Sequence, residues 1–222
     1  MRRCPLCHSG DTVRFYANKK RCLYHCHHCQ LVFADASSHL PPSAELQKYR
    51  LANNKQKPLA RFMLDLVSQC EDGTNPLLGL NFGRTLDSKT LQKINARGHQ
   101  LYQYDPSQAP WSSQLKQEYD FICCYQVFEH FRFPYKEWEL LSHLLKPGGW
   151  MAICTPLLSE LNAFDKWHHK NNLTHVSFYQ RATFEFLANR VGFKLLFAAN
   201  DLILVQKPSG SDITRDQTSV VA

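Results

Sequence analysis

Long hydrophobic runs are missing from this chain of 222 residues, as are internal repeats and low-complexity segments. Its apolar stretches are far shorter than the roughly 20 residues that a transmembrane helix needs, which argues against a spanning segment or a membrane partner. The chain begins Met-Arg-Arg-Cys-Pro and lacks the apolar core of a secretory signal. We therefore expect a cytoplasmic protein with one main domain, for which 44% hydrophobic residues provide an ordinary core.

Cysteine, by contrast, is abundant: there are nine, and four of them form two C-x-x-C pairs. The pairs are Cys4 with Cys7 and Cys26 with Cys29. Two such pairs at this separation predict one tetrahedral zinc site. Four thiolates close the coordination sphere, so the zinc is expected to be structural and to fold residues 1–35, which are too few to bury a core alone. Free buried thiols or a disulfide pair are the alternative, and the odd cysteine total fits a reducing compartment.

The formal net charge of +7 is concentrated near the N-terminus. Residues 1–60 contain ten Lys and Arg residues and three acidic residues, which accounts for the whole excess. A basic module of this kind can bind RNA or another polyanion. We favour a solvated basic surface, because a zinc tetrathiolate carries about −2 and offsets part of this field.

Beyond residue 76, patterns typical of strands and helices alternate along the chain. The strands are expected at 77–82, 99–104, 119–125, 150–154, 193–199 and 202–206. The helices are expected at 43–51, 60–67, 134–145 and 180–190, and between Asp87 and Gly98. Repeated strand–helix–strand units imply a parallel sheet with helices on both faces, and Asn200-Asp201 predicts a tight hairpin.

The predicted fold class is therefore α/β: a Rossmann-like doubly wound sheet, mostly parallel, with a C-terminal antiparallel hairpin and a small N-terminal zinc ribbon. Four segments are expected along the chain. They are the zinc ribbon at 1–35, a helical linker region at 36–75 with a polar stretch at 53–58, the main domain at 76–207 and a flexible tail at 208–222.

Four stretches of this sequence occur together in one known family. They are the cysteine pairs followed by Leu31-Val-Phe33, the run from Gly98 to Asp105-Pro106, the run from Tyr119 through Val127-Phe-Glu-His130 to Gly149, and Thr174-His175-Val-Ser-Phe-Tyr179. In this order they resemble the class I S-adenosylmethionine-dependent methyltransferases, in a branch with an N-terminal zinc ribbon. The resemblance covers the chain from Cys4 to about Lys207, and it implies S-adenosylmethionine as the cofactor.

The cofactor is expected at the carboxyl ends of the strands, where open parallel sheets bind ligands. Asp105 ends the second strand of the main domain, so its carboxylate can accept hydrogen bonds from both ribose hydroxyls. Its alternative role is to form the turn before Pro106. Gln126, Val127 and Phe128 follow a neighbouring strand and are expected to line the same crevice.

The glycine-rich loop of the resembling family is reduced in this chain. The matching run, Asn81-Phe-Gly83-Arg-Thr85-Leu-Asp87, keeps one glycine, and Asn81 replaces the usual acidic residue. Asn81 and Gly83 are still expected beside the cofactor. Because Thr85 is β-branched and Asp87 adds negative charge, unless it serves only as a helix cap, the loop predicts weak cofactor binding or a different loop shape.

Three residues are candidates for catalysis. Glu129 and His130 are expected where an acceptor approaches the methyl group, with a helix N-terminal acid and a surface histidine as the alternatives. His175 lies in a segment rich in histidine and aromatic residues, which covers the active site in the resembling family. It is predicted to act as a general base, unless it is a histidine hydrogen-bonded between core elements.

Two functions follow from these patterns. The first is methyl transfer from S-adenosylmethionine to a small molecule or sugar derivative, which we favour over RNA because the chain has no aromatic-basic RNA-binding motif. The second is a catalytically degenerate methyltransferase fold that acts as a binding or scaffold module.

Overall fold

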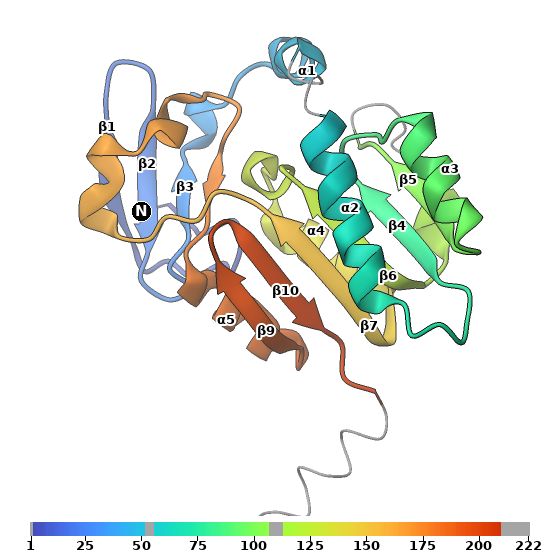
Figure 1. The fold of residues 1–222 in the computed structure, drawn as a ribbon. Helices are drawn as coiled ribbons and strands as arrows, with labels where there is room; N and C mark the ends of the chain where they lie inside the picture. The colour runs from blue at the N-terminus through green and yellow to red at the C-terminus, as the bar shows by residue number, and fades with distance from the viewer. Residues whose placement is uncertain (1, 52–55, 107–112, 210–222) are drawn as a thin grey trace, which may run out of the picture.

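A small and a large β-sheet lie side by side in this protein (Figure 1). The computed structural model describes residues 2–51, 56–106 and 113–209. The small sheet has the strand order β1-β2-β3-β8, and the large sheet has the order β5-β4-β6-β7-β10-β9. The predicted α/β class, with a mostly parallel sheet and a C-terminal antiparallel hairpin, is confirmed.

The elements have the following bounds. The strands of the small sheet are β1 (Thr12–Ala17), β2 (Cys22–Cys26), β3 (Val32–Ala34) and β8 (Ser177–Phe178). Those of the large sheet are β4 (Leu78–Phe82), β5 (Gln100–Tyr104), β6 (Tyr119–Tyr125), β7 (Leu145–Cys154), β9 (Lys194–Ala199) and β10 (Leu202–Gln206). The α-helices are α1 (Pro42–Leu51), α2 (Gln56–Cys70), α3 (Ser88–Ala96), α4 (Pro134–Leu144) and α5 (Arg181–Val191). Short 3-10 helices include η3 (Phe128–His130) and η5 (His168–Asn171).

The order of the large sheet creates a binding position at one edge. Strand β4 pairs in parallel with β5 on one side and with β6 on the other, so the chain reverses its direction of winding between them. Ligands bind beyond the carboxyl ends of strands at such a switch point. Strand β10 runs antiparallel to both β7 and β9. Asn200 and Asp201, with φ of 51° and 63°, form the tight turn of this hairpin as predicted.

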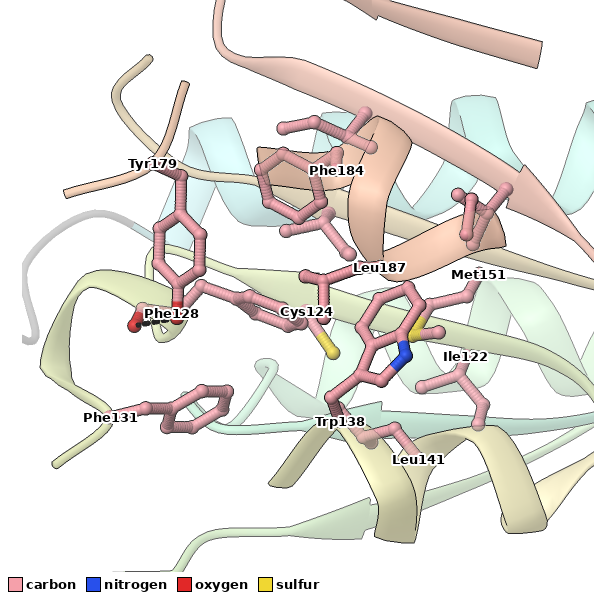
Figure 2. Packing of buried hydrophobic residues seen from close by; sticks show 14 of the residues in the cluster. Ile122, Cys124, Phe128, Phe131, Trp138, Leu141, Met151, Tyr179, Phe184 and Leu187 are labelled. Carbon is pink, nitrogen blue, oxygen red and sulfur yellow. Dashed lines mark hydrogen bonds between the residues drawn. The ribbon is translucent and has the colours of Figure 1, made fainter. Parts of the chain in front are cut away.

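Helices cover both faces of the large sheet because side chains along a strand point alternately to opposite faces. On β6, Phe121 and Cys123 belong to the core that packs against α2 and α3. Ile122 and Cys124 belong to the core on the other face, where Trp138 of α4 packs between the sheet and α5 (Figure 2). The apolar run 121–125 is thus buried from both sides.

Gly79 makes room for this packing. It pairs with Phe121 on the neighbouring strand, and a Cβ atom at position 79 would lie 2.1 Å from the Phe121 Cζ. Any larger residue would displace a fully buried ring.

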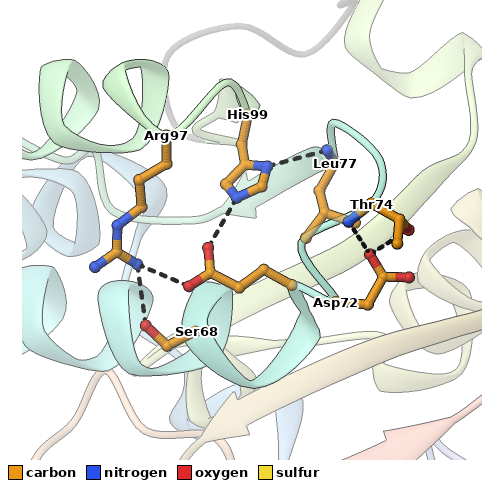
Figure 3. Close-up of polar contacts among 7 residues, drawn as sticks. Ser68, Asp72, Thr74, Leu77, Arg97 and His99 are labelled. Atoms are coloured by element: carbon orange, nitrogen blue, oxygen red, sulfur yellow. Dashed lines mark hydrogen bonds and ion pairs between the residues drawn. The ribbon is translucent and has the colours of Figure 1, made fainter.

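A polar cluster ties the end of α2 to the start of β5 (Figure 3). The backbone N–H of Leu77 donates to His99 Nδ1 at 3.1 Å, so the ring proton lies on Nε2, which is 3.0 Å from Glu71 Oε2. Arg97 Nη1 lies 3.5 Å from the other carboxylate oxygen of Glu71. These contacts hold α2 against the parallel part of the sheet.

The small sheet joins the N-terminal strands to a segment much later in the chain. Strand β8 pairs with β3, the backbone N–H of Ala34 donates to the Val176 carbonyl at 2.8 Å, and the Gln180 side chain donates to the Gln30 carbonyl at 2.6 Å. The sheet that contains residues 12–34 therefore also contains residues 177–178. The segment before α5 is fixed by the N-terminal strands.

Local signals in the sequence set several helix ends. Asp87 caps α3, since its carboxylate accepts from the backbone N–H of Thr90 at 2.9 Å. Gly98 and Gly192 follow α3 and α5 with φ of 86° and 70°, a region that favours glycine.

Two expected boundaries differ from the structure. Residues 56–58 of the expected polar stretch form the first turn of α2, where Pro58 is tolerated because its missing N–H is not needed. Strand β7 begins at Leu145, five residues before the expected start of this strand at residue 150. Residues 53–55 and most of the expected tail, 210–222, lie outside the described residues. Within the described ranges, none of the helices has the length and apolar character that crossing a membrane requires.

Candidate functional site

Two cavities meet at the carboxyl ends of β4, β5 and β6. The larger has a volume of about 540 Å³ and the smaller about 350 Å³. His130 and Thr174 line both cavities. A molecule in one cavity can therefore approach a molecule in the other at these two residues.

The larger cavity has mainly apolar walls and three carboxylates, those of Glu45, Asp105 and Glu137. Phe82 at the end of β4, Tyr104 at the end of β5 and Phe131 after η3 contribute their rings. Asp105 directly follows β5 and is 8% exposed. Helix α1 contributes a further wall, held by an ion pair between Glu45 and Arg132. Apolar surfaces beside the hydrogen-bond-accepting carboxylate of Asp105 fit an adenosyl group.

The smaller cavity is polar. Its lining residues are mostly basic, amide or imidazole side chains: Lys48, Arg84, Gln126, Glu129, His130, Pro156, His168, His169, Asn172, Thr174 and His175. Four histidines from three segments of the chain thus line the same cavity as one buried glutamate. This composition fits a polar ligand.

Glu129 is the buried acid of the smaller cavity. It is 4% exposed, and its Oε2 accepts a hydrogen bond from the Thr155 hydroxyl at 2.8 Å. Burial raises the pKa of the Glu129 carboxyl to about 7, although its own backbone N–H, Thr155 and the charge of Arg84 oppose the rise. The carboxyl can therefore take up or release a proton near neutral pH.

His130 is held as a neutral imidazole. Its Nδ1 lies 2.9 Å from the Thr174 carbonyl, which can only accept, so Nδ1 carries the proton and Nε2 keeps the lone pair. Burial lowers the pKa of His130 to about 4, with the Thr174 carbonyl acting in the opposite direction.

His175 completes a group of three. Its ring centroid lies 5.0 Å from that of His130, and one ligand atom each of Glu129, His130 and His175 lie within 4.8 Å of one another. The structure thus brings His175 to the adjacent pair Glu129 and His130, although His175 lies 46 positions after Glu129 in the sequence.

Arg21, directly before β2, fixes the backbone of this last histidine. The residue is 4% exposed, and its guanidinium donates to the carbonyls of Lys170 at 2.8 Å, Asn172 at 3.1 Å and His175 at 2.5 Å. Burial lowers the pKa of Arg21 to about 10. The N-terminal segment therefore positions one wall of the smaller cavity.

The expected cofactor residues are divided among three environments. Asp105, Pro106 and Val127 line the larger cavity, and Gln126 lines the smaller one. Phe128 does not line either: it is 1% exposed and packs against Trp138 and other rings, while its carbonyl accepts from the Tyr179 hydroxyl (Figure 2). Strand β6 ends at Tyr125, and Phe128 begins η3, where its side chain lies in the core.

The reduced glycine loop folds against itself. The Asn81 side chain is buried and donates to the Arg84 carbonyl at 2.6 Å, so it holds the loop and does not reach either cavity. Gly83 has φ of 118°, and a Cβ there would lie 3.1 Å from the Val127 Cβ, which explains why this glycine is retained. Of the described residues, neither Thr85 nor Asp87 lines either cavity.

Several residues of the site were not identified from the sequence. They are Arg21, Arg84, Thr155 and Thr174. Arg84 offered a signal, as a basic residue within the expected cofactor loop. Arg21 offered none, since it reaches a segment 149 or more positions away.

The four N-terminal cysteines form a separate cluster. The Sγ atoms of Cys4 and Cys29 are 3.5 Å apart, those of Cys7 and Cys26 are also 3.5 Å apart, and all four lie within 4.8 Å of one another. A zinc ion with Zn–S bonds of about 2.3 Å would hold tetrahedral sulfurs about 3.8 Å apart. None of the nine cysteines, all of which lie within the described residues, forms a disulfide. The cluster therefore fits a zinc ion.

The sequence profile of a family described as Methyltransferase domain matches residues 27–197. The chain belongs to this family. Its large sheet is thus that of a methyltransferase domain, as the resemblance implied. The zinc-ribbon branch stays a prediction.

A solved structure agrees with this fold. An O-methyltransferase family protein from Burkholderia thailandensis is 15% identical with a TM-score of 0.50, over 76% of this chain. This chain spans 62% of the length of that protein. The 1,6-didemethyltoxoflavin-N1-methyltransferase of the same organism was solved with bound 1,6-didemethyltoxoflavin and S-adenosylhomocysteine. It is 12% identical with a TM-score of 0.49, over 88% of this chain and 99% of its own. Among curated proteins, none matches this chain.

Proposed function

We propose that this protein transfers a methyl group from S-adenosylmethionine to a small polar acceptor. The junction of the two cavities at His130 and Thr174 carries the proposal. It allows an adenosyl donor on one side and an acceptor on the other to meet at one point. The cofactor supplies an activated methyl group on a sulfonium, so the protein has mainly to align the reactants and exclude water.

The larger cavity is the donor site in this proposal. Asp105 accepts hydrogen bonds from the ribose hydroxyls, while Pro106 and Val127 contact the adenosyl group. Asn81 and Gly83 support the donor site without lining it. Asn81 holds the loop through its hydrogen bond to the Arg84 carbonyl, and Gly83 leaves room for Val127. Gln126 lies on the acceptor side, and Phe128 supports the site from the core.

The smaller cavity is the acceptor site. Its volume of about 350 Å³ favours a small molecule or sugar derivative over RNA. Glu129, His130 and His175 are the candidate catalytic residues, because their polar atoms converge beside the shared wall. His130 is a neutral imidazole with its proton on Nδ1, so its unprotonated nitrogen Nε2 is an electron-pair donor.

The four cysteines hold a structural zinc ion in this proposal. The ion would fix the turns that flank β1, β2 and β3. Since β3 pairs with β8 and Arg21 binds the 170–175 backbone, the zinc site would also support the acceptor cavity. This role needs no nucleic acid, which agrees with a solvated basic surface.

Calorimetric titration of the zinc-loaded protein with S-adenosylmethionine and S-adenosylhomocysteine tests the donor site. We expect binding of both, and at least tenfold weaker binding to Asp105→Asn, because a charged hydrogen-bond acceptor contributes about 1.5–3 kcal/mol. Asp72→Asn, in an exposed turn after α2, is the control and should bind like the wild type.

The scaffold alternative has one observation in its favour, the loss of glycines in the 81–87 loop. It makes the opposite prediction in the same titration. A folded, zinc-loaded protein that binds neither compound at millimolar concentration would exclude the donor site and favour the scaffold.

A further inference from the structure

We propose that Glu129, His130 and His175 bind a divalent cation, separate from the cysteine cluster, in the smaller cavity. Two imidazoles and one carboxylate form a ligand set that holds divalent transition metals while leaving coordination positions open. One ligand atom from each residue lies within 4.8 Å of the others, so small side-chain movements bring all three onto one ion.

Two of these ligands also make the hydrogen bonds to neighbouring residues that orient the ligands of a metal site. His130 donates its Nδ1 proton to the Thr174 carbonyl at 2.9 Å, which leaves the Nε2 lone pair for a metal. Glu129 accepts from the Thr155 hydroxyl at 2.8 Å, which orients its carboxylate. The partners in these two hydrogen bonds are themselves buried: Thr174 is 5% exposed and Thr155 is 0% exposed.

The third ligand is fixed through its backbone. Arg21 donates to the His175 carbonyl, and the backbone N–H of His175 donates to the Asn172 carbonyl at 3.0 Å. The neighbouring Val176 N–H donates to the Glu129 carbonyl at 2.8 Å. The segment that carries the third ligand is thus attached directly to the residue that supplies the first.

The charge of the cavity indicates what completes the coordination. Arg84 and Lys48 line the same cavity, so a dication beside Glu129 alone would leave an excess of positive charge. An acceptor with a negatively charged or readily ionised oxygen removes this excess and fills the open positions. The acceptor class is therefore an oxygen nucleophile, such as a hydroxyl beside a second oxygen donor.

This part of the inference rests on the proposed function, because it assigns the open positions to the acceptor. The cation would lower the pKa of the acceptor hydroxyl, whose proton leaves to solvent. The oxygen electron pair then forms the new bond to the methyl carbon as the carbon–sulfur bond breaks. The pair of that broken bond stays on sulfur, which leaves as neutral thioether.

Mn²⁺ binding to the zinc-loaded protein, followed by electron paramagnetic resonance, tests the site without any acceptor or donor. We expect one Mn²⁺ per chain in addition to the zinc, with a dissociation constant below the millimolar range. Glu129→Gln keeps the shape of the side chain and the contact to Thr155, and it should weaken binding at least tenfold. His175→Ala should weaken it similarly, whereas His143→Ala, on an exposed part of α4, should leave it unchanged.

Two results would overturn the proposal: no saturable Mn²⁺ binding up to millimolar concentration, or equal binding by the wild type and by Glu129→Gln. Unfolding curves of each variant identify any that fail to fold. If His175→Ala fails to fold, the isosteric Glu129→Gln still decides the test. The donor titration is run on the same samples. If the wild type binds S-adenosylhomocysteine but not Mn²⁺, only the metal site is rejected. If it binds Mn²⁺ but not S-adenosylhomocysteine, only the donor site is rejected.

Discussion

Glu137 provides a sharp test of the packing around the larger cavity. It lies in the first turn of α4, lines the cavity, and its Oε2 is buried without a hydrogen-bond partner among the described residues. Burial raises the pKa of the Glu137 carboxyl from 4.5 to about 7, against the opposing effects of its own backbone N–H and of Lys136. The ionised carboxylate is therefore less stable in the folded protein than in the unfolded chain.

The sign and size of the effect follow from linkage. Between pH 4.5 and 7 the folded state binds more protons at this group than the unfolded state, so the free energy of unfolding falls as the pH rises through this window. At about 1.4 kcal/mol per pKa unit the full effect is about 3 kcal/mol. Because part of the side chain reaches solvent, we expect about 1–2 kcal/mol.

Glu137→Gln removes this titration while keeping the shape of the side chain. We expect the difference in unfolding free energy between variant and wild type to favour the variant by about 1–2 kcal/mol more at pH 8 than at pH 5. Urea denaturation of both proteins at the two pH values, with saturating zinc and no donor, measures this difference. Glu118→Gln, on an exposed residue, is the control and should show no such change. A difference that does not depend on pH would refute the reasoning.

Two further predictions concern the core and the small sheet. Gly79→Ala should lower the unfolding free energy by about 1–3 kcal/mol, because the added Cβ overlaps the Phe121 ring. Urea denaturation measures this, with Gly10→Ala as the control, because a Cβ at position 10 meets nothing within 4 Å. Equal unfolding midpoints for Gly79→Ala and the wild type would contradict the packing. Arg21→Met should increase backbone hydrogen exchange in residues 170–176 at least tenfold while the protein retains its zinc, and unchanged protection would show that the guanidinium contacts do not hold this segment.

Local patterns were sufficient where one segment decides its own structure. The alternation of strands and helices, Asp87 as a helix cap and the Asn200-Asp201 hairpin depend on contacts within a few residues, and the structure confirms them. The beginning of α2 was misjudged because its polar first turn resembles a linker. Only the packing of the rest of that helix on β6 shows where it starts.

The site was accessible to sequence reasoning only in part. Asp105 was placed correctly at a strand end because the carboxyl edge of a parallel sheet is a general binding position. Phe128 was expected in the crevice, but its backbone turns the side chain into the core. The direction of a side chain after a strand depends on the loop that follows, and the sequence does not specify that loop.

The sequence by itself determined the α/β class, the paired cysteine spacing and the residues at the strand ends, because each follows from periodicity or short-range chemistry. Only the tertiary structure decided that β8 joins the N-terminal strands and that Arg21 holds the segment of His175. It also decided that Glu129, His130 and His175 converge between two cavities. These contacts join residues far apart in the chain, and their geometry depends on how two sheets pack, which no single segment encodes.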